Sequence, residues 1–275
     1  MPELPEVETI RLQLQKNVVG KKITDVRVVS GRKLNLSPAQ FIRAVRGATI
    51  KGARRRAKLL LINLGNGWTM VIHLKMTGRV LLEKDGTAVS KHAFVVFKLS
   101  GGKQLVWEDV RKFGFLKLVK TSKLDDLWKK QGFGPEPLDS SFTPQVLAAC
   151  LARHKGKRIK PLIMEQTCIA GLGNIYAAEV LWFAGVHPNR ATGKIRDAEV
   201  KKMYDGIRKI LPRAIDYRGS SADSYLDLFG KPGEFVPRLS VYDRDGKPCL
   251  RRDGGIIKKI RTGGRGTYYC SVCQI

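Results

Sequence analysis

The chain has 275 residues, in which 51 lysines and arginines stand against 24 aspartates and glutamates, a formal charge of +27. This length predicts two main domains with a small appendage. So large a basic excess favours nucleic acid as partner over a small neutral substrate. No apolar run approaches the roughly 18 residues of a membrane span, and the acidic N-terminus lacks the basic segment of a signal peptide. We therefore expect a cytoplasmic protein.

The opening "MPELPEVETI" predicts a helix from about Pro5 to Lys16. Proline at the first helical position costs no hydrogen bond, and Glu6 and Glu8 complement the helix dipole. Pro2 has no such explanation. The stretches that follow are rich in β-branched and aromatic residues with Gly-rich breaks, which predicts a β-sandwich or barrel over residues 1–130. These stretches are "KKITDVRVV", "AKLLLINL", "WTMVIHLKM", "AFVVFKL", "QLVWEDV" and "FLKLV".

The second half of the chain has a different pattern. A helical stretch at "SKLDDLWKK" precedes a Gly-, Pro- and Ser-rich linker at 131–143. Residues 144–239 then predict a helical domain. Its last part, residues 218–238, is a long loop of a length that is usually functional or disordered. Residues 240–275 form a small module, in which "IIKKIRTGGRGTYYC" predicts a hairpin because Gly-Gly supplies the positive φ angles of a two-residue turn. The predicted fold class is α+β.

The five cysteines do not form an evenly spaced disulfide framework. Cys150 and Cys168 lie in apolar helical surroundings, so we expect them to be buried thiols. The other three cysteines, Cys249, Cys270 and Cys273, belong to the C-terminal module.

Pro2 has a chemical explanation. Initiator methionine is normally removed before a small residue or proline, which would leave Pro2 with a secondary α-amino group. Such an amine titrates near neutrality, far below the ~10.4 of lysine, and is nucleophilic. Its attack on a sugar C1′ would give an iminium that deprotonation at nitrogen cannot neutralise, and this electron sink would weaken neighbouring C–O bonds. Glu3 lies beside this centre as a proton donor or acceptor.

Four motifs in order resemble the bacterial formamidopyrimidine-DNA glycosylase family: "PELPEVET", "DVRKFG", "GLGNIYAAE" and "GRGTYYCSVC". The resemblance implies a monomeric, nucleoid-associated enzyme of base excision repair, both glycosylase and abasic-site lyase. It would act on double-stranded DNA that contains abasic sites or oxidised purines such as 8-oxoguanine and formamidopyrimidines. The implied fold is an N-terminal β-sandwich with a leading helix, a helical domain with a helix-two-turns-helix motif, and a zinc-finger-like β-hairpin.

The resemblance implies three catalytic residues. Pro2 corresponds to the Schiff-base nucleophile, Glu3 to the acid/base, and Lys58 to a lysine that grips the phosphate beside the lesion. Taken alone, the "RRRAK" around Lys58 would be a solvated basic edge strand. Glu6 is interpreted either as a pocket acid near the flipped nucleotide or as a charge at the helix start.

The loop at 218–238 matches the family's lesion-reading loop. The backbone carbonyl of Ser220 is implied to accept the N7–H that 8-oxoguanine has and guanine lacks, and Tyr225 is placed in the same pocket. Asp223 departs from the basic residue common in relatives, which leaves the details of base recognition open.

The resemblance also implies a wedge that fills the hole left by an extruded base, formed by Met76, Arg111 and Phe113. A guanidinium can donate to both N3 and O2 of the widowed cytosine. The alternative places Met76 and Phe113 in an ordinary core. Phosphate contacts are implied for His73, Asn174, Tyr176 and Arg265, although an asparagine at a helix start is also an ordinary cap.

The tail departs from the family's four-cysteine zinc site, C-x2-C-x16-C-x2-C. Cys270 and Cys273 supply its second half, and Cys249 one residue of the first. Counting forward from Cys249 reaches Arg252, whereas counting back from Cys270 reaches Asp253. Zinc would therefore be held by three thiolates and an oxygen from Asp253 or water, or the hairpin stands without metal, or the recorded sequence differs here from its natural parent.

Two other functions remain open from the sequence. A non-catalytic DNA-binding protein, ribosomal or architectural, fits the charge and the tail but does not require Pro2 and Glu3. An endonuclease VIII-like glycosylase for oxidised pyrimidines fits the fold, although such proteins usually carry glycine at the position of Leu4.

Overall fold

The structure, a computed structural model, describes residues 1–222 and 224–275. Its internal contacts divide the chain into a first unit, residues 1–131 with 217–236, and a second unit, residues 132–216 with 237–275. The long loop therefore packs with the first unit, where Tyr225 and Leu228 join the core. The sequence had grouped this loop with the helical segment. Asp223 lies outside the described residues.

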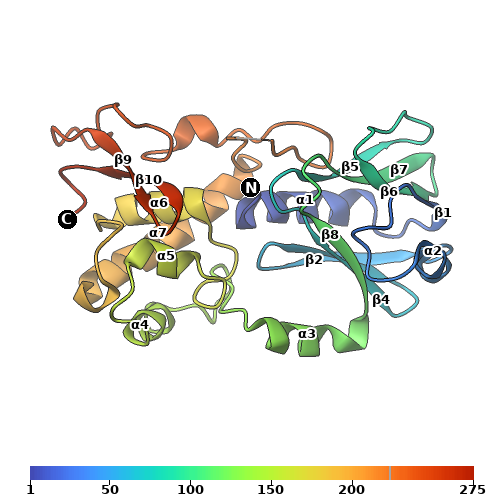
Figure 1. Cartoon of the computed structure of the whole chain (residues 1–275), viewed down its shortest axis with the longest axis horizontal. Coiled ribbons are helices and arrows are strands. Elements are labelled where there is room, and N and C mark those ends of the chain that lie inside the picture. The colour runs from blue at the N-terminus through green and yellow to red at the C-terminus, as the bar shows by residue number, and fades with distance from the viewer. Residues whose placement is uncertain (223) are drawn as a thin grey trace. The chain divides into compact units, whose positions relative to one another are not determined.

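The first unit is an antiparallel β-sandwich behind an N-terminal helix, α1 (Leu4–Asn17), which confirms the fold expected there (Figure 1). One sheet has the order β1-β6-β7-β5, with strands Ile23–Val28, Ala93–Leu99, Lys103–Asp109 and Gly78–Lys84. The other has the order β2-β3-β4-β8, with strands Ile50–Arg56, Leu59–Leu64, Trp68–His73 and Phe115–Lys120. The unit also contains α2 (Pro38–Val45), the short η1 (Thr121–Lys123) and α3 (Leu124–Gln131).

A single hydrophobic core joins both sheets to α1 and α2. β3, "LLLINL", is buried at all but one position because α1 packs against β2 and β3. A strand covered on both faces loses the alternation of apolar and polar residues, as β3 does. The contacts with β2 and β3 therefore hold α1, and with it the N-terminal residues, against this sheet.

The second unit contains the predicted helices, α4 (Pro144–Ala152), α5 (Ile159–Met164), α6 (Asn174–Ala184) and α7 (Asp197–Asp216). α6 packs against α7 and against β10 of the hairpin β9 (Ile257–Thr262) and β10 (Arg265–Cys270). Gly263 and Gly264, with φ of 55° and 75°, form the hairpin's two-residue turn, as the sequence predicted. Two short helices complete the unit's chain, η2 (Thr192–Lys194) and most of η3 (Val236–Arg238). None of the helices in residues 1–222 and 224–275 combines the length and apolar character needed to span a bilayer.

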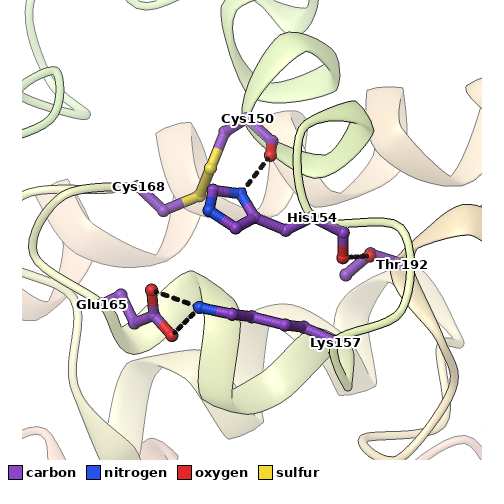
Figure 2. The surroundings of a disulfide bond; sticks show 6 residues. All are labelled: Cys150, His154, Lys157, Glu165, Cys168 and Thr192. Atoms are coloured by element: carbon purple, nitrogen blue, oxygen red, sulfur yellow. Dashed lines mark hydrogen bonds and ion pairs between the residues drawn. A yellow bond between two sulfur atoms is a disulfide. The ribbon is translucent and has the colours of Figure 1, made fainter.

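Cys150 and Cys168 correct the sequence interpretation. Both are buried, as expected, but they form a disulfide instead of remaining free thiols (Figure 2). The fold of the second unit brings their Cα atoms to 5.7 Å, within the usual range for such a bond. His154 and the ion pair between Lys157 and Glu165 flank the bridge (Figure 2). Apolar surroundings predicted burial, but not that the two sulfurs meet.

Candidate active site and nucleic-acid interface

The N-terminus of α1 holds Pro2 and Glu3 in a defined position. Glu3 is the N-cap, and its side chain accepts a hydrogen bond from the backbone N–H of Glu6. Glu6 Oε2 in turn accepts one of 2.8 Å from the backbone N–H of Glu3, which completes a capping box. Pro2, Glu3 and Glu6 are all buried. The capping box thus fixes Glu3 at the start of α1, and Pro2 lies buried directly before it.

Glu6 also holds the long loop. Its Oε1 accepts a hydrogen bond of 2.7 Å from the backbone N–H of Ser220. Gly219 precedes it with a φ of +82°, and a Cβ there would lie 2.7 Å from Glu6 Oε1, so glycine is required on both counts. The Tyr225 hydroxyl donates to the backbone carbonyl of Glu6 at 3.3 Å. Glu6 is therefore more than a charge at the helix start, because it joins the helix to the loop.

Partly buried hydrogen bonds tie the next part of this loop to α1 and to itself. Gln13 of α1 donates to Asp227 Oδ2 and accepts from the backbone N–H of Leu228, both at 2.9 Å. The Ser221 hydroxyl donates to the backbone carbonyl of Tyr225 at 2.7 Å. Burial, reinforced by the carboxylates of Glu6 and Asp227, raises the pKa of Tyr225 well above its usual value. Tyr225 is therefore a neutral hydrogen-bond donor in this position.

Lys58 lies in the tight turn between β2 and β3, after Ala57 with its φ of 51°. Only 7% of Lys58 is exposed, so the solvated-edge interpretation does not describe it. Arg55 bridges this turn to α1, because it donates to Glu8 Oε2 and to the carbonyl of Ala57, both at 2.9 Å. The lysine is thereby held beside the first turns of α1.

His73 ends β4 and lies opposite Leu59, the residue after Lys58. Burial first, and then the charges of Lys75 and Lys58, lower the pKa of His73 to about 3. The ring is neutral at physiological pH. Its Nδ1 accepts a hydrogen bond of 3.0 Å from the backbone N–H of Lys75, so the proton lies on Nε2. His73 and Lys58 together present one neutral and one charged donor.

The three side chains of the expected wedge are exposed on two neighbouring loops. Met76, between β4 and β5, is 38% exposed, and Phe113, between β7 and β8, is 53% exposed. The guanidinium of Arg111 lies over the ring of Phe113, 5.0 Å from its centroid. The alternative that Met76 and Phe113 are core residues is excluded by this exposure.

Two residues that the sequence analysis missed, Asp109 and Thr77, hold the wedge loops together. Asp109 is buried, and its Oδ1 accepts hydrogen bonds from the Thr77 hydroxyl at 2.5 Å and from the backbone N–H of Arg111 at 3.2 Å. Its Oδ2 accepts one of 2.6 Å from the backbone N–H of Gly114. An aspartate at the end of a strand, with a glycine five residues later, is a turn signal that could have identified Asp109. Nothing local could have indicated its bond to Thr77.

In the second unit, Asn174 is the first residue of α6, and its N-cap is Gly173. Asn174 Oδ1 accepts a hydrogen bond of 2.7 Å from Lys160, and its amide donates to the carbonyl of Gly266 at 3.0 Å. Lys160, which is buried and which the sequence analysis missed, also donates to the hydroxyl of Thr267 at 2.8 Å. The start of α6 is thus connected to the hairpin.

The two other residues expected to contact phosphate in this unit differ in accessibility. Arg265 is exposed beside the turn of the hairpin. Tyr176 is completely buried in α6, so a direct phosphate contact by its side chain is not supported. Arg265 therefore remains a candidate DNA contact, and Tyr176 packs in the core of the unit.

Four side chains of the C-terminal module converge as a candidate metal site: Cys249, Asp253, Cys270 and Cys273. Their ligand atoms all lie within 4.8 Å of one another, and the sulfurs of Cys249 and Cys273 are 3.9 Å apart. Tetrahedral zinc with Zn–S bonds of about 2.3 Å separates two thiolates by ~3.8 Å. Asp253, and not Arg252, supplies the fourth group, because its oxygens lie 3.6 and 3.7 Å from Cys270 Sγ.

The module is shaped for sulfur ligands. Cys270 Sγ accepts contacts from the backbone N–H groups of Val272 and Cys273 at 3.4 and 3.5 Å, and the indole N–H of Trp182 points to Cys249 Sγ at 3.4 Å. Such donors stabilise thiolates. A Cβ on Gly255 would lie 2.5 Å from Cys270 Sγ, so only glycine allows the chain to pass here. The residues present fit a zinc ion with three sulfur ligands and one carboxylate.

Two family models match the chain. The formamidopyrimidine-DNA glycosylase N-terminal domain matches residues 1–116, and the formamidopyrimidine-DNA glycosylase H2TH domain matches residues 133–225. Proteins named formamidopyrimidine-DNA glycosylase from Pelotomaculum thermopropionicum and Ligilactobacillus salivarius are each 42% identical to this chain, over 100% of it and 99% of their own length.

Solved structures of the Lactococcus lactis protein have the same fold. One, a variant in complex with a Fapy-dG containing DNA, has a TM-score of 0.93 and 38% identity, covering 99% of each chain. Another, in complex with an abasic site containing DNA, has the same score, identity and coverage. A third holds an oxidised pyrimidine containing DNA, with a TM-score of 0.92.

Proposed function

Because the chain belongs to the formamidopyrimidine-DNA glycosylase family and is a DNA glycosylase of base excision repair, we propose that it excises oxidised purines and then cleaves the abasic strand. The observation that carries this proposal is the start of α1. There the capping box fixes Glu3, the residue after the buried Pro2, and Glu6 joins Glu3 to the loop at Ser220.

The proposed reaction begins with removal of Met1, which frees the ring nitrogen of Pro2. This nitrogen forms a bond to C1′ while the glycosidic bond breaks, and the departing base takes a proton. Glu3 is the group that moves protons at the sugar. The C1′–O4′ bond then breaks with a proton delivered to O4′, which opens the sugar ring and leaves an iminium between Pro2 and C1′. The iminium acidifies the C2′ hydrogen, so the 3′ C–O bond breaks by β-elimination and the 5′ C–O bond by δ-elimination. The product is a one-nucleotide gap with phosphate at both ends.

Around this centre, the neutral donor of His73 and the charge of Lys58 bind the phosphates beside the lesion. In the second unit, Asn174 and Arg265 bind further phosphates of the DNA. Met76, Arg111 and Phe113 fill the hole left by the base. Their exposure on two loops held together by Asp109 supports this assignment.

For the substrate, we propose purines with a proton at N7, such as 8-oxoguanine, read by the carbonyl of Ser220, together with formamidopyrimidines and abasic sites. The Lactococcus lactis structures hold Fapy-dG and abasic DNA, which supports this range. Oxidised pyrimidines are the alternative substrate class, because a related structure also holds one. Leu4, at the position where endonuclease VIII-like proteins usually carry glycine, favours purines.

We also propose that zinc is bound by Cys249, Cys270, Cys273 and Asp253, and that its role is to stabilise the fold of the module that presents Arg265. Zinc of this kind contributes folding energy and takes no part in the reaction. The enzyme acts as a monomer on chromosomal DNA, which places it at the bacterial nucleoid in the cytoplasm.

Borohydride reduction tests the proposed function. With an abasic duplex, wild-type protein should yield a covalent adduct, because the reductant converts the iminium to a stable amine. Pro2→Gly should trap poorly, and a chain with residues fused ahead of Pro2 should not trap, although it should still bind DNA through its basic surface. Trapping that survives a blocked N-terminus would move the nucleophile to a lysine, with Lys58 the first suspect.

A further inference from the structure

The long loop of the first unit lies along an edge strand. β5 is the last strand in its sheet order, so in the part of the chain that the structure describes one of its edges has no strand beside it. The backbone N–H of Leu82 in β5 donates to the carbonyl of Leu228 in the loop at 2.8 Å. Since Leu228 is also bound by Gln13 of α1, the loop is held between the helix and the strand.

A second set of contacts joins the loop to β5 at its other end. Arg79 donates from Nε and Nη2 to the backbone carbonyl of Ser224, at 3.2 and 3.1 Å. The Ser224 hydroxyl donates to the backbone carbonyl of Met76 at 3.0 Å. Glu108, which is buried on β7, lies 3.4 Å from Arg79 Nη1 and helps to orient the guanidinium.

These contacts reach the wedge directly. The carbonyl that receives the Ser224 hydroxyl belongs to Met76 itself, and the next residue, Thr77, donates to Asp109 in the loop that carries Arg111. These hydrogen bonds, together with the peptide bond between Met76 and Thr77, therefore link Arg79 and Ser224 to both wedge loops. The same loop is held at Ser220 by Glu6, which also accepts the backbone N–H of Glu3.

We propose that Arg79 and Ser224 are positioning residues that couple the loop to the wedge, so that the loop holds an extruded base while Met76 occupies the hole left in the stack. This inference rests on the proposed function. An enzyme that acts on an extruded base must keep the base in its pocket and the gap filled at the same time. A fork of two guanidinium donors on one carbonyl fixes the loop more firmly than a single donor does.

The experiment compares base excision with abasic-site cleavage. Arg79→Met removes the guanidinium and keeps an apolar stem, and Ser224→Ala removes the hydroxyl. Each variant is measured in single turnover on a duplex with 8-oxoguanine opposite cytosine and on a preformed abasic duplex. We expect base excision to fall about tenfold or more in Arg79→Met, because hydrogen bonds from a charged group are lost, and about fivefold in Ser224→Ala, which loses one neutral hydrogen bond. Abasic cleavage should stay within about twofold in both variants.

Lys84→Met is the matched control, because it removes an exposed positive charge from the same strand. It should leave the ratio of the two rates unchanged. Arg79→Lys should recover part of the excision rate. The double variant Arg79→Met/Ser224→Ala should be no slower than the slower single variant, because the two contacts act in series and loss of either one uncouples the loop from the wedge.

Equal losses on both substrates, or fully additive losses in the double variant, would overturn the coupling and leave a general folding role. Unchanged excision in Arg79→Met and Ser224→Ala would also overturn it. Failure of the proposed function has a different signature, because wild-type protein would then form no borohydride adduct on the abasic duplex.

Discussion

The carboxylate of Glu6 accepts a hydrogen bond of 2.7 Å from the backbone N–H of Ser220, 214 residues away in the chain. Its other oxygen accepts the backbone N–H of Glu3 at 2.8 Å. One buried side chain thus serves the residue next to the proposed nucleophile and the residue proposed to read the base. The position of each depends on the other through Glu6.

Glu6→Gln tests this shared dependence. An amide nitrogen cannot accept a hydrogen bond, so one of the two bonds must be lost, and an unsatisfied buried donor costs about 1–3 kcal/mol. We expect a lower free energy of unfolding by this amount and slower base excision. Urea unfolding and single-turnover rates measure the two effects. Asp205→Asn, which neutralises an exposed carboxylate, is the control and should change neither.

Arg111→Ala should weaken discrimination of the base opposite the lesion, by about 1–3 kcal/mol, because a bidentate contact to the orphan base is lost. Abasic cleavage needs no base extrusion and should suffer less. Excision rates with each of the four opposite bases measure the effect. Lys112→Ala removes the neighbouring exposed charge and should weaken binding to all duplexes alike. If Arg111→Ala did the same, Arg111 would be a phosphate contact.

His73 predicts a pH dependence of stability. Its pKa is lowered from 6.5 in an ordinary histidine to about 3 in the folded protein. Between these values the unfolded chain binds the additional proton, so His73 makes the free energy of unfolding rise with pH in this window and fall as pH drops through it. His73→Gln should flatten this part of the stability curve. A variant curve that keeps the full wild-type slope there would show that other groups cause it.

Local signals predicted much of the fold. Proline and carboxylates at the start of α1, and Gly-Gly in the hairpin, act through their own backbone, so their effects are visible in a few residues. β5 was not predicted, and of β2 only the "RRR" end was interpreted as an edge strand, because "GRVLLEK" and "IKGARRR" are too polar to indicate whole strands without their sheet neighbours. The helix α2 was missed although Ser37 and Pro38 mark its start.

Many residues of the candidate site could be predicted only from family motifs. The contacts that hold these residues in place could not be predicted from the sequence at all. Asp109 with Thr77, and Lys160 with Asn174 and Thr267, join residues that lie far apart in the sequence. Such pairs arise from tertiary packing, which no local pattern records.

The disulfide between Cys150 and Cys168 gives a chemical prediction. Alkylation of protein unfolded with a chelator and no reductant should modify three cysteines, the free Cys249, Cys270 and Cys273, whereas reduction should raise the number to five. Closing a loop of this length stabilises a fold by about 3 kcal/mol, so reduction should lower the thermal unfolding midpoint. Five reactive cysteines without reductant would contradict the bridge.

Asp253, and not its neighbour Arg252, is the fourth residue of the candidate metal site. The structure places the carboxylate of Asp253 among the sulfurs of Cys249, Cys270 and Cys273. Asp253→Cys should therefore complete a four-thiolate site and slow the loss of zinc to a chelator, because thiolates are softer ligands than a carboxylate. Arg252→Cys, which recreates the usual spacing from Cys249, should not. Metal content over the time of chelation measures both, and the thermal unfolding midpoint of the zinc-free protein reports whether the hairpin stands without metal. Slower zinc loss in Arg252→Cys than in Asp253→Cys would show that the fourth ligand enters from position 252.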